Sequence, residues 1–506
     1  MKKIAIISAI VLGFGFASCD SYLDINQDPN SPAESNMTPS IMLPAAEMNL
    51  AATYGNLMRI PAGYYTQHFA QTFGTSNYLD YSQFTMSATR SSSAYSQMMR
   101  GALENLETIR NLSKEKELWG SYLAATTLRA FGFQALVDCY GEVPFTEAFQ
   151  GVANPTPHYD QGADIYAALI AELDEALGKA SASDPVATNF LFPDQKAGVW
   201  IQFANAVKLK ILSRESGVAS VDSQIGAIIS EGNLPAADVA FANCWSSGNG
   251  QMNPYYSEEF ASGFGSNQIN VVANVAIINT MLLKDSEGAL LYQDPRLAAF
   301  FEPNGSGNYT GGISGSNFST SKSFKSSYWC RPVASYDMPV YLITKSEIEF
   351  FIAEYYARQG NHDEAAAHYA AAIAASFATA GVEGAEENLE FFPYDSSNYK
   401  KSIGIAKWVA LTGTNDFESY CELRRLRYPS FGTVKGSDMY NLQTDDSYKP
   451  ELLAPGTLYT PIQVNGNIGD NKLLERYPYP SSSTANNANA PKFENSDYTK
   501  PIFWAN

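Results

Sequence analysis

The sequence predicts a mostly α-helical protein that carries one large irregular region. Two long stretches, 41–235 and 341–435, place apolar residues at the three- and four-residue spacing of amphipathic helices. Between them, residues 236–340 lose this periodicity and are rich in Gly, Ser and Asn. Because an irregular stretch of this length is uncommon in a compact domain, it indicates a functional loop region. We therefore expect a helical body in two parts that carries a ligand-binding region of loops.

The N-terminus has the pattern of a bacterial export signal. Two lysines precede an apolar run over 4–16, which is shorter than the roughly 20 residues needed to span a bilayer. Ala17, Ser18 and Cys19 follow, which is the small-residue and cysteine pattern of a lipoprotein cleavage site. We predict that residues 1–18 are removed and that Cys19 carries acyl chains, each buried methylene of which adds about 0.8 kcal/mol of membrane affinity. An ordinary secretory signal with a chance cysteine is the alternative.

The mature chain is expected to begin with an extended tether. Residues 19–40 are polar and contain three prolines, a composition that favours an extended chain. In the first helical part, apolar spacing predicts separate helices over 105–112, 118–137, 165–177 and 200–212. Short helices are predicted near 277–283 and 295–301 inside the irregular region. The last stretch, 436–506, is rich in Pro, Asn and Tyr and is predicted to wrap over the helices.

Residues 344–376 contain the clearest local motif, a helix–turn–helix pattern of small and aromatic residues. Its packing positions are Ala353, Tyr356, Gly360, Ala365, Tyr369 and Ala372. Small residues let two antiparallel helices approach, Gly ends the first helix, and Tyr fills the groove between them, as in a tetratricopeptide repeat. One such pair cannot bury its own face, so further pairs, such as 117–138 with 163–178, are expected to stack with it.

Composition and cysteine content limit the classes of partner. The formal net charge of −19 repels nucleic acid and anionic lipid, so neither is an expected partner. Cys139 and Cys421 lie in helical patterns and are predicted to be buried free thiols. Cys244 and Cys330 lie in the irregular region, where an exported chain could join them in a disulfide, and the sequence leaves this pairing open.

Aromatic residues in polar loops predict a neutral ligand with apolar faces and hydroxyl groups, most simply a carbohydrate. Only 17% of the residues are charged, whereas Tyr (31) and Phe (28) are abundant. The candidate ring residues are Tyr78 and Tyr81 in one loop, and Trp245, Tyr309 and Trp329 in the irregular region, where Tyr255 and Tyr256 also lie. Asn77, Asn249 and Asn308 are the candidate hydrogen-bonding partners. The alternative is that each ring packs beneath a loop.

No catalytic, metal-binding or cofactor motif stands out. The four histidines have no metal-ligand spacing, and no G-x-S-x-G or paired-cysteine zinc motif occurs. Glu258 and Glu259 are expected to form a solvated pair of loop charges. Arg424, Arg425 and Arg427 lie near a predicted helix C-terminus, where the helix dipole favours cations, so a structural role is expected.

The ordered segments of the mature chain resemble the SusD/RagB family of nutrient-binding outer-membrane lipoproteins. The resemblance is carried by Cys19 to Asn26 with Asp28-Pro29-Asn30, by Leu128-Arg129-Ala130 leading to Asp138-Cys139-Tyr140-Gly141-Glu142, by Tyr328-Trp329 and the helix over 342–354, by the segment 418–429, and by Arg476-Tyr477-Pro478 with Asn486-Asn487. Each segment is weak alone, but their order along nearly the whole mature chain is specific.

The resemblance implies four tetratricopeptide-like helix pairs, a place on the cell surface, and a partner that resembles the SusC-type TonB-dependent transporter. It implies a non-catalytic protein that binds an oligosaccharide and delivers it to the transporter, without a cofactor. A peptide-binding member of the same family and a surface hydrolase that acts on glycans or peptides are the alternatives. The identity of the ligand, and whether a structural cation is bound, stay open.

Overall fold

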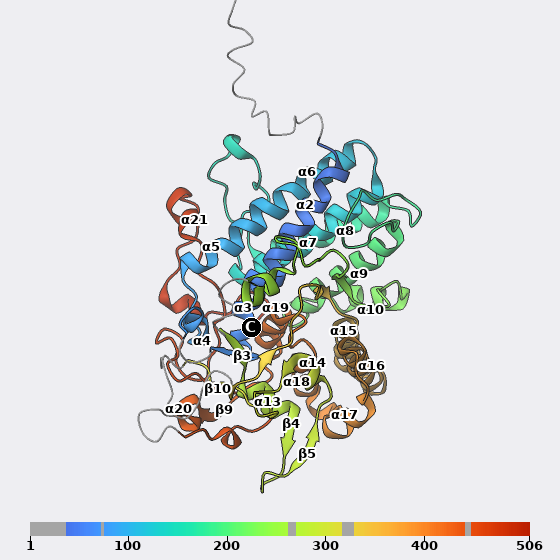
Figure 1. Cartoon of the computed structure of the whole chain (residues 1–506). Coiled ribbons are helices and arrows are strands. Elements are labelled where there is room, and N and C mark those ends of the chain that lie inside the picture. Colours follow the sequence, from blue (N-terminus) through green and yellow to red (C-terminus); the bar gives the residue numbers. More distant parts are fainter. Residues whose placement is uncertain (1–36, 72–74, 262–269, 316–327, 441–446, 506) are drawn as a thin grey trace, which may run out of the picture.

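Helices are the main elements of the protein, and the strands labelled in Figure 1 lie from its middle to its lower end. The computed structural model describes residues 37–71, 75–261, 270–315, 328–440 and 447–505. The predicted leader, Cys19 and most of the tether lie outside the described residues. The first described helix, α2, begins at Pro39, so it includes the last two residues of the stretch predicted to be extended. Proline is favoured in a first helical turn because its missing N–H has no intrahelical partner there.

The first helical part contains the helices that apolar spacing predicted, with a few more. They are α2 (Pro39–Ala52), α3 (Arg59–Tyr65), α4 (Leu79–Ser82), α5 (Ala88–Ser96), α6 (Glu104–Glu115), α7 (Trp119–Tyr140), α8 (Gly162–Lys179), α9 (Ala197–Glu215) and α10 (Asp222–Glu231), with π-helical turns η2 (Thr53–Met58) and η3 (Gln97–Leu103) and a short 3₁₀ turn η4 (Gly151–Ala153). Helix α7 is buried along almost its whole length because α6, α8 and α9 all pack against it. The predicted packing of 117–138 against 163–178 is therefore confirmed.

The second helical part consists of α15 (Lys345–Arg358), α16 (His362–Ala380), α17 (Ala385–Phe391), η7 (Ser396–Asn398), α18 (Tyr399–Ala410) and α19 (Asp416–Leu426). Helices α15 and α16 pack as a pair, and Gly360 between them adopts a positive φ of 73°. Ala353 and Ala365 are both 0% exposed, as predicted for positions where two helices touch. Further contacts run from α9 to α15, then through α18 and α19 to α3, so the pairs stack into one body.

Replacing Ala365 with Trp should destabilise the protein by about 1–3 kcal/mol, because a large ring cannot enter a packed helix contact without displacing its neighbours. Ala367 provides the matched control, since it lies on the same helix but is exposed. Ala367→Trp should leave the urea midpoint close to that of the wild-type protein. Equal midpoints for the two variants would show that α15 and α16 do not pack as described.

A buried network of ion pairs joins five of these helices. Arg214 of α9 pairs with Glu418 of α19 at 2.6 Å, with Asp138 of α7 at 3.4 Å, and with Glu422. Extending the network, Lys210 pairs with Glu347 of α15 and with Glu418, Lys407 of α18 pairs with Glu422, and Arg425 pairs with Glu354 and Glu422. Each charge is paired across a helix contact, so the network defines how these helices lie against one another.

Glu422 shows the electrostatic effect of this network. Burial acts to raise the pKa of its carboxyl group, but Arg425, Lys407 and Arg214 lower that pKa well below its usual range. A carboxyl group whose pKa is lowered on folding stabilises the protein above its unfolded pKa of about 4.3. This contribution is lost as the pH falls through the lower, folded-state pKa.

The structural role predicted for Arg424 and Arg425 agrees with their contacts. Arg425 belongs to the ion-pair network, and Arg424 is buried and donates hydrogen bonds to the Asp138 and Glu475 carbonyls.

The irregular region contains short helices and two-stranded ladders. Its helical segments are α11 (Pro254–Tyr256), η5 (Ser257–Ala261), α13 (Val275–Met281) and α14 (Arg296–Phe300), and the last two confirm the short helices predicted there. The strands of the whole chain are β1 (Phe69–Gln71), β2 (Val239–Phe241), β3 (Val271–Ala273), β4 (Leu282–Lys284), β5 (Leu290–Gln293), β6 (Phe301–Glu302), β7 (Arg331–Pro332), β8 (Val340–Ile343), β9 (Ser430–Lys435) and β10 (Thr457–Thr460).

The strands form five two-stranded ladders, one of which connects the irregular region to the first helical part. The antiparallel pairs are β1–β3, β2–β8, β4–β5 and β6–β7, while β9 and β10 pair in parallel. In the β1–β3 ladder, Phe69 opposes Ala273, which connects the first helical part to the irregular region. The β4–β5 hairpin projects from the lower end of the molecule in Figure 1.

The C-terminal stretch lies over the helices. It contains α20 (Gly436–Met439), η8 (Pro450–Leu452), α21 (Ser481–Asn486) and η9 (Asn495–Thr499). The Tyr477 N–H donates to the Cys139 carbonyl of α7 at 2.8 Å, and the Trp504 indole N–H donates to Asp138 at 2.9 Å. Trp504 is fully buried, so this stretch completes the core around α7.

The four cysteines in the described residues are free thiols. Cys139 and Cys421 are buried, as predicted. Cys244 and Cys330, which the sequence left as a candidate disulfide, are not joined. Burial raises the pKa of the Cys330 thiol, and its sulfur accepts a hydrogen bond from the Thr310 N–H at 3.2 Å.

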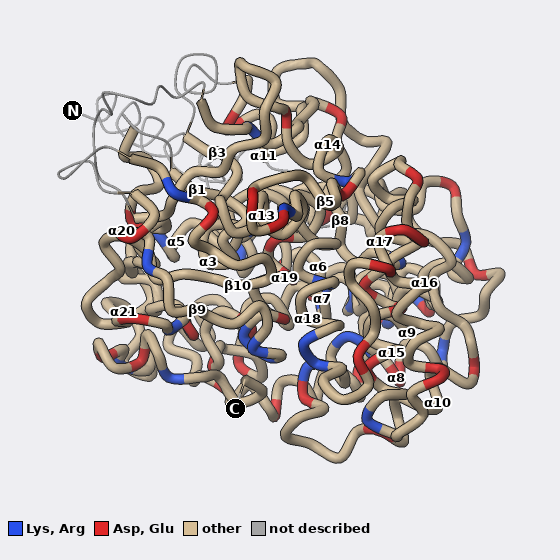
Figure 2. Tube along the Cα trace, turned by 90° about the horizontal axis from the view of Figure 1, so that it is seen from below, with Lys and Arg blue, Asp and Glu red and all other residues tan. Residues whose placement is uncertain are grey.

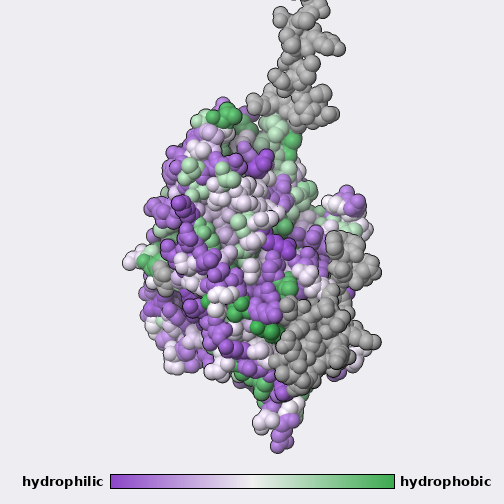
Figure 3. All heavy atoms as spheres, turned by 90° about the vertical axis from the view of Figure 1, so that its left-hand side faces the viewer, coloured by the Kyte–Doolittle hydropathy of each residue, from purple (hydrophilic) through white to green (hydrophobic). Residues whose placement is uncertain are grey.

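Charged residues of both signs are interspersed along the chain (Figure 2). Among the coloured residues of the face shown in Figure 3, hydrophilic ones predominate and hydrophobic ones appear in small groups. Within the described residues, no helix has the length and apolar character required to cross a bilayer.

Candidate ligand-binding site

A cavity of about 860 Å³ lies beside the β4–β5 hairpin, within the size range of small-molecule sites. Its walls come from α13, from the hairpin, from the loop over 304–310 and from the C-terminal stretch. The lining residues are Ile278, Asn279, Leu282, 284–288, Asn304, Ser306, Asn308, Tyr309, Thr310, Tyr328, Tyr448, Pro450, Glu451, Leu453 and Pro455. We call it the Tyr309 cavity.

Asn304 holds the loop that presents two of the predicted ligand residues. Its side-chain oxygen accepts hydrogen bonds from the N–H groups of Ser306 at 2.9 Å and Asn308 at 3.0 Å. Its side-chain nitrogen donates to the Tyr328 carbonyl at 2.9 Å and to the Thr310 hydroxyl at 3.2 Å. Because Asn304 is buried and bonded on both sides, it fixes the loop that carries exposed Asn308 and half-buried Tyr309.

Three tyrosines give the cavity its aromatic character. Tyr328 and Tyr448 meet edge to face, with ring centroids 6.0 Å apart, and buried Trp329 supports Tyr448 at 5.2 Å. The Tyr448 hydroxyl donates to the Gly311 carbonyl at 2.7 Å, which fixes the position of this ring. Burial raises the pKa of Tyr309 and of Tyr328, so both side chains stay neutral at pH 7 and can donate and accept hydrogen bonds.

Polar groups close the remaining sides of the cavity. The Asn279 side chain donates to the carbonyls of Pro450 at 2.7 Å and Leu453 at 3.0 Å, which joins α13 to the C-terminal wall. In the hairpin turn, Asp285 accepts hydrogen bonds from the N–H groups of Glu287 and Ala289. The cavity therefore combines aromatic rings with amide, hydroxyl and carboxylate groups, and hydrogen bonds hold its walls in place.

The structure brings Tyr309, Asn308 and Trp329 to one place and leaves the other candidate residues elsewhere. Tyr309 and Asn308 line the cavity itself. Trp329 lies behind the wall as packing for Tyr448, which is the alternative role considered for it from the sequence.

Tyr78 and Tyr81 are buried, contrary to the open loop position expected for them. They are 5% and 7% exposed and stack on each other with ring centroids 5.7 Å apart. The Tyr78 hydroxyl donates to Glu259, which is itself buried, so the expectation that Glu258 and Glu259 form a solvated pair is wrong for Glu259. The hydrogen bonds from Tyr78 and Asn270 give this carboxyl group its polar surroundings.

The remaining predicted residues lie away from the Tyr309 cavity. Trp245 is partly buried and its indole N–H donates to the Phe241 carbonyl at 2.8 Å, while Asn249 is exposed in the turn that follows. Asn77 is half-buried, and its carbonyl accepts a hydrogen bond from Arg90 at 2.6 Å. Tyr255 is fully buried, with the Arg59 guanidinium 4.2 Å above its ring.

The roles of Tyr328, Tyr448, Asn304 and the β4–β5 hairpin were not predicted from the sequence. Tyr328 directly precedes Trp329 in a segment already noted as distinctive, so its aromatic neighbour was an available signal. Tyr448 and Asn304 are 144 residues apart by number and meet only through folding, and no local pattern marks either one.

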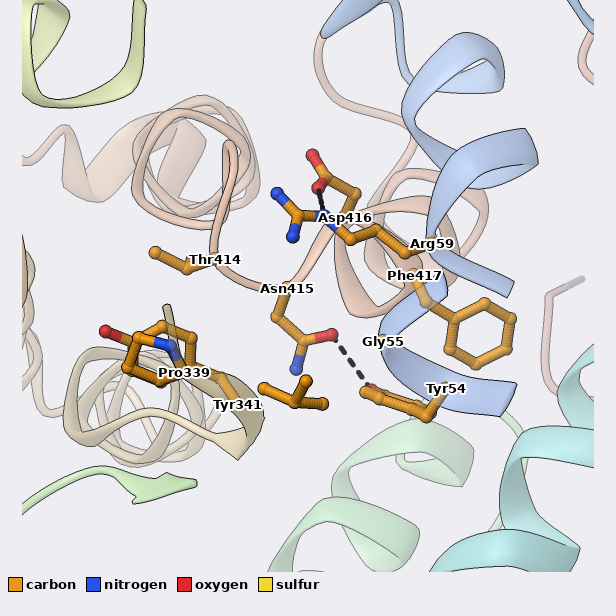
Figure 4. A pocket seen from close by; sticks show the side chains of 10 residues that line it. Tyr54, Gly55, Arg59, Pro339, Tyr341, Thr414, Asn415, Asp416 and Phe417 are labelled. Atoms are coloured by element: carbon orange, nitrogen blue, oxygen red, sulfur yellow. Dashed lines mark hydrogen bonds and ion pairs between the residues drawn. The ribbon is translucent and has the colours of Figure 1, made fainter. Parts of the chain in front are cut away.

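Ser419, His68 and Asp416 form a Ser–His–Asp grouping, and Asp416 also lines the small cavity of Figure 4. The His68 ring bonds Asp416 through Nδ1 at 2.7 Å, and its Nε2 lies 3.1 Å from the Trp408 carbonyl and 3.5 Å from the Ser419 hydroxyl. Figure 4 shows Arg59 directed at Asp416, and Asn415 directed at Tyr54.

This grouping is a structural element rather than a hydrolase site. The ring nitrogen that would have to accept a proton from Ser419 instead faces a carbonyl oxygen, which requires it to donate. All three side chains are buried, and the neighbouring cavity of about 10 Å³ has room for about one water molecule. In the parts of the chain that the structure describes, no group of three His, Cys, Asp or Glu residues is placed to hold a metal ion.

Comparison with known proteins identifies related sequences and folds. A family described as "Starch-binding associating with outer membrane" matches residues 29–447. A SusD homologue from Bacteroides uniformis has 20% identity and a TM-score of 0.70, with 91% of this chain and 98% of that chain covered.

Two further solved structures show the same fold. A chitin-binding SusD homologue from Flavobacterium johnsoniae has 19% identity and a TM-score of 0.69, over 91% of this chain and 98% of that chain. A SusD/RagB family protein from Bacteroides thetaiotaomicron has 17% identity and a TM-score of 0.66, over 93% and 99% of the two chains. No protein with a curated description matches this chain in sequence.

Proposed function

The chain belongs to the SusD/RagB family, and from this premise we propose that it is a cell-surface lipoprotein that binds an oligosaccharide in the Tyr309 cavity and delivers it to a TonB-dependent transporter. The cavity is the observation that carries the proposal. It joins the aromatic rings of Tyr309, Tyr328 and Tyr448 to amide and hydroxyl groups in a space of about 860 Å³.

This combination suits a sugar better than a charged or wholly apolar ligand. A pyranose ring presents an apolar face of C–H groups that can pack on tyrosine, while its hydroxyls exchange hydrogen bonds with neutral side chains. Asn308 is exposed at the cavity and the Tyr309 hydroxyl forms no hydrogen bond with the described residues, so both can bind ligand hydroxyls. The Asn304 side chain is already hydrogen-bonded to the protein and holds the loop in place.

Two glycan classes are the first to test. The matching family is described as starch-binding, and one solved relative is described as chitin-binding. Calorimetry with maltohexaose, chitohexaose and a panel of other neutral oligosaccharides should give saturable binding to at least one glycan. A panel of neutral peptides tests the peptide-binding alternative, and binding of peptides alone would contradict the carbohydrate proposal.

Replacing Cys19 with Ala should release the protein from the outer-membrane fraction, because the lipid anchor would then have no attachment atom. Cell fractionation followed by immunoblotting measures this. Replacing Cys244 with Ala is the matched control, since this cysteine is a free thiol far along the chain, and this variant should stay in the membrane fraction. If the Cys19→Ala protein also stays there, the proposed anchor is wrong.

Mild detergent extraction followed by affinity purification should recover a large TonB-dependent outer-membrane protein together with this chain. The measurement is mass spectrometry of the purified complex without crosslinking. An unrelated outer-membrane lipoprotein carrying the same tag serves as the control. Repeated recovery of the chain alone would contradict a stable transporter complex, while leaving the glycan-binding proposal to be judged by calorimetry.

A further inference from the structure

A second cavity, of about 370 Å³, lies where α19 ends and the C-terminal stretch crosses it. We call it the Lys472 cavity. It shares no lining residue with the Tyr309 cavity. Its chemistry is defined by Leu423, Arg427, Phe431, Lys472, Leu473 and Glu475.

The floor of the Lys472 cavity is apolar and mostly aliphatic. Leu423 and Leu473 are buried there, and the half-buried ring of Phe431 adds one aromatic surface. The three-tyrosine arrangement that suits sugar rings in the Tyr309 cavity is missing from the residues lining this second space. Ser430, Asn471 and Thr499 also line the cavity. The apolar floor itself favours an aliphatic or aryl group over a polyhydroxylated ring, since hydroxyls buried against aliphatic carbon lack partners.

The charges around this floor sum to one positive charge. Arg427 is 44% exposed at its side chain, pairs with buried Glu475, and donates to the Ala505 carbonyl at 2.6 Å, so its charge is balanced. Lys472 is exposed and has no ion-pair partner among the described residues. Asp470 is close in sequence, but its carboxylate forms an ion pair with Lys435 and does not neutralise the charge of Lys472.

A positively charged pocket is distinctive on a chain with a formal net charge of −19. A cation beside an apolar floor attracts an anionic head group and buries the apolar body attached to it. We propose that the Lys472 cavity is a second ligand site, which takes a small organic carboxylate with an apolar body. The carboxylate pairs with Lys472, and the body packs on Leu423, Phe431 and Leu473. This site is independent of the proposed glycan function.

Calorimetry with sodium octanoate, below its micelle concentration, tests the proposal on the full mature chain. We expect saturable binding at one site, and at least a tenfold loss of affinity in Lys472→Glu. Octylammonium, which has the same apolar body and the opposite charge, should not bind measurably. Lys116→Glu is the matched control, since this exposed lysine lines neither cavity, and its octanoate affinity should equal that of the wild-type protein.

A second variant, Phe431→Ala, should weaken octanoate binding while preserving the melting temperature, because this ring is only half-buried. Thermal unfolding of every variant separates loss of the site from loss of the fold. The proposal is overturned if octanoate does not bind, if octylammonium binds equally well, or if folded Lys472→Glu keeps the wild-type affinity.

Discussion

Replacing Arg214 with Met should lower the free energy of unfolding by about 3–5 kcal/mol, the cost expected for removing one partner from a buried ion pair. Arg214 is fully buried and contacts Glu418, Glu422 and Asp138. Met fills a similar volume, so the loss would arise mainly from carboxylates left without their cation rather than from a cavity. Urea unfolding followed by circular dichroism measures the change.

Arg100→Met is the matched control for this experiment, since Arg100 is exposed and its substitution should change stability by less than about 0.5 kcal/mol. Comparable losses for the two variants would show that the buried network does not hold the helices together. Lowering the pH should reduce the difference between Arg214→Met and the wild-type protein, because protonated carboxyl groups no longer need the cation.

Replacing Tyr309 with Ala should weaken oligosaccharide binding by on the order of tenfold, which corresponds to about 1.4 kcal/mol. The ring lines the cavity and its hydroxyl is free to bond a ligand, whereas its half-buried position carries little of the core. The melting temperature should therefore change little. Calorimetry with the glycan selected by the binding panel, and thermal unfolding of the same sample, provide the two measurements.

Two other tyrosines make this result specific. Tyr336→Ala removes an exposed ring outside the cavity and should leave both affinity and stability unchanged. Tyr78→Ala should instead destabilise the protein by about 3–5 kcal/mol, as for other large buried rings. A Tyr309→Ala protein that stays folded and binds with wild-type affinity would move the ligand site away from this cavity.

The helical body was predictable because local spacing reports which face of a helix is buried. The α15–α16 pair shows this best, since the roles of Ala353 and Ala365 follow from small size and that of Gly360 from its freedom to adopt a positive φ. The same logic explains why the irregular region was recognised by lost periodicity, although its short ladders were not. Strands of two to four residues contain too few alternations to reveal a pattern.

Burial of individual loop residues could not be predicted, because it depends on partners far away in the sequence. Tyr78, a candidate ligand residue in a polar loop, is buried and donates to Glu259, whose local sequence predicted a solvated charge. For the same reason, only some of the residues that line the Tyr309 cavity were predicted from the sequence. Tyr309 and Asn308 lie in a polar loop whose composition is informative, whereas Tyr448 reaches the site from the C-terminal stretch.

A crystal structure of the protein with the tightest-binding oligosaccharide would test the central proposal most directly. We expect a sugar ring to pack against Tyr309 and Asn308 to form hydrogen bonds with its hydroxyls. A glycan bound at another surface, with the Tyr309 cavity empty, would contradict it.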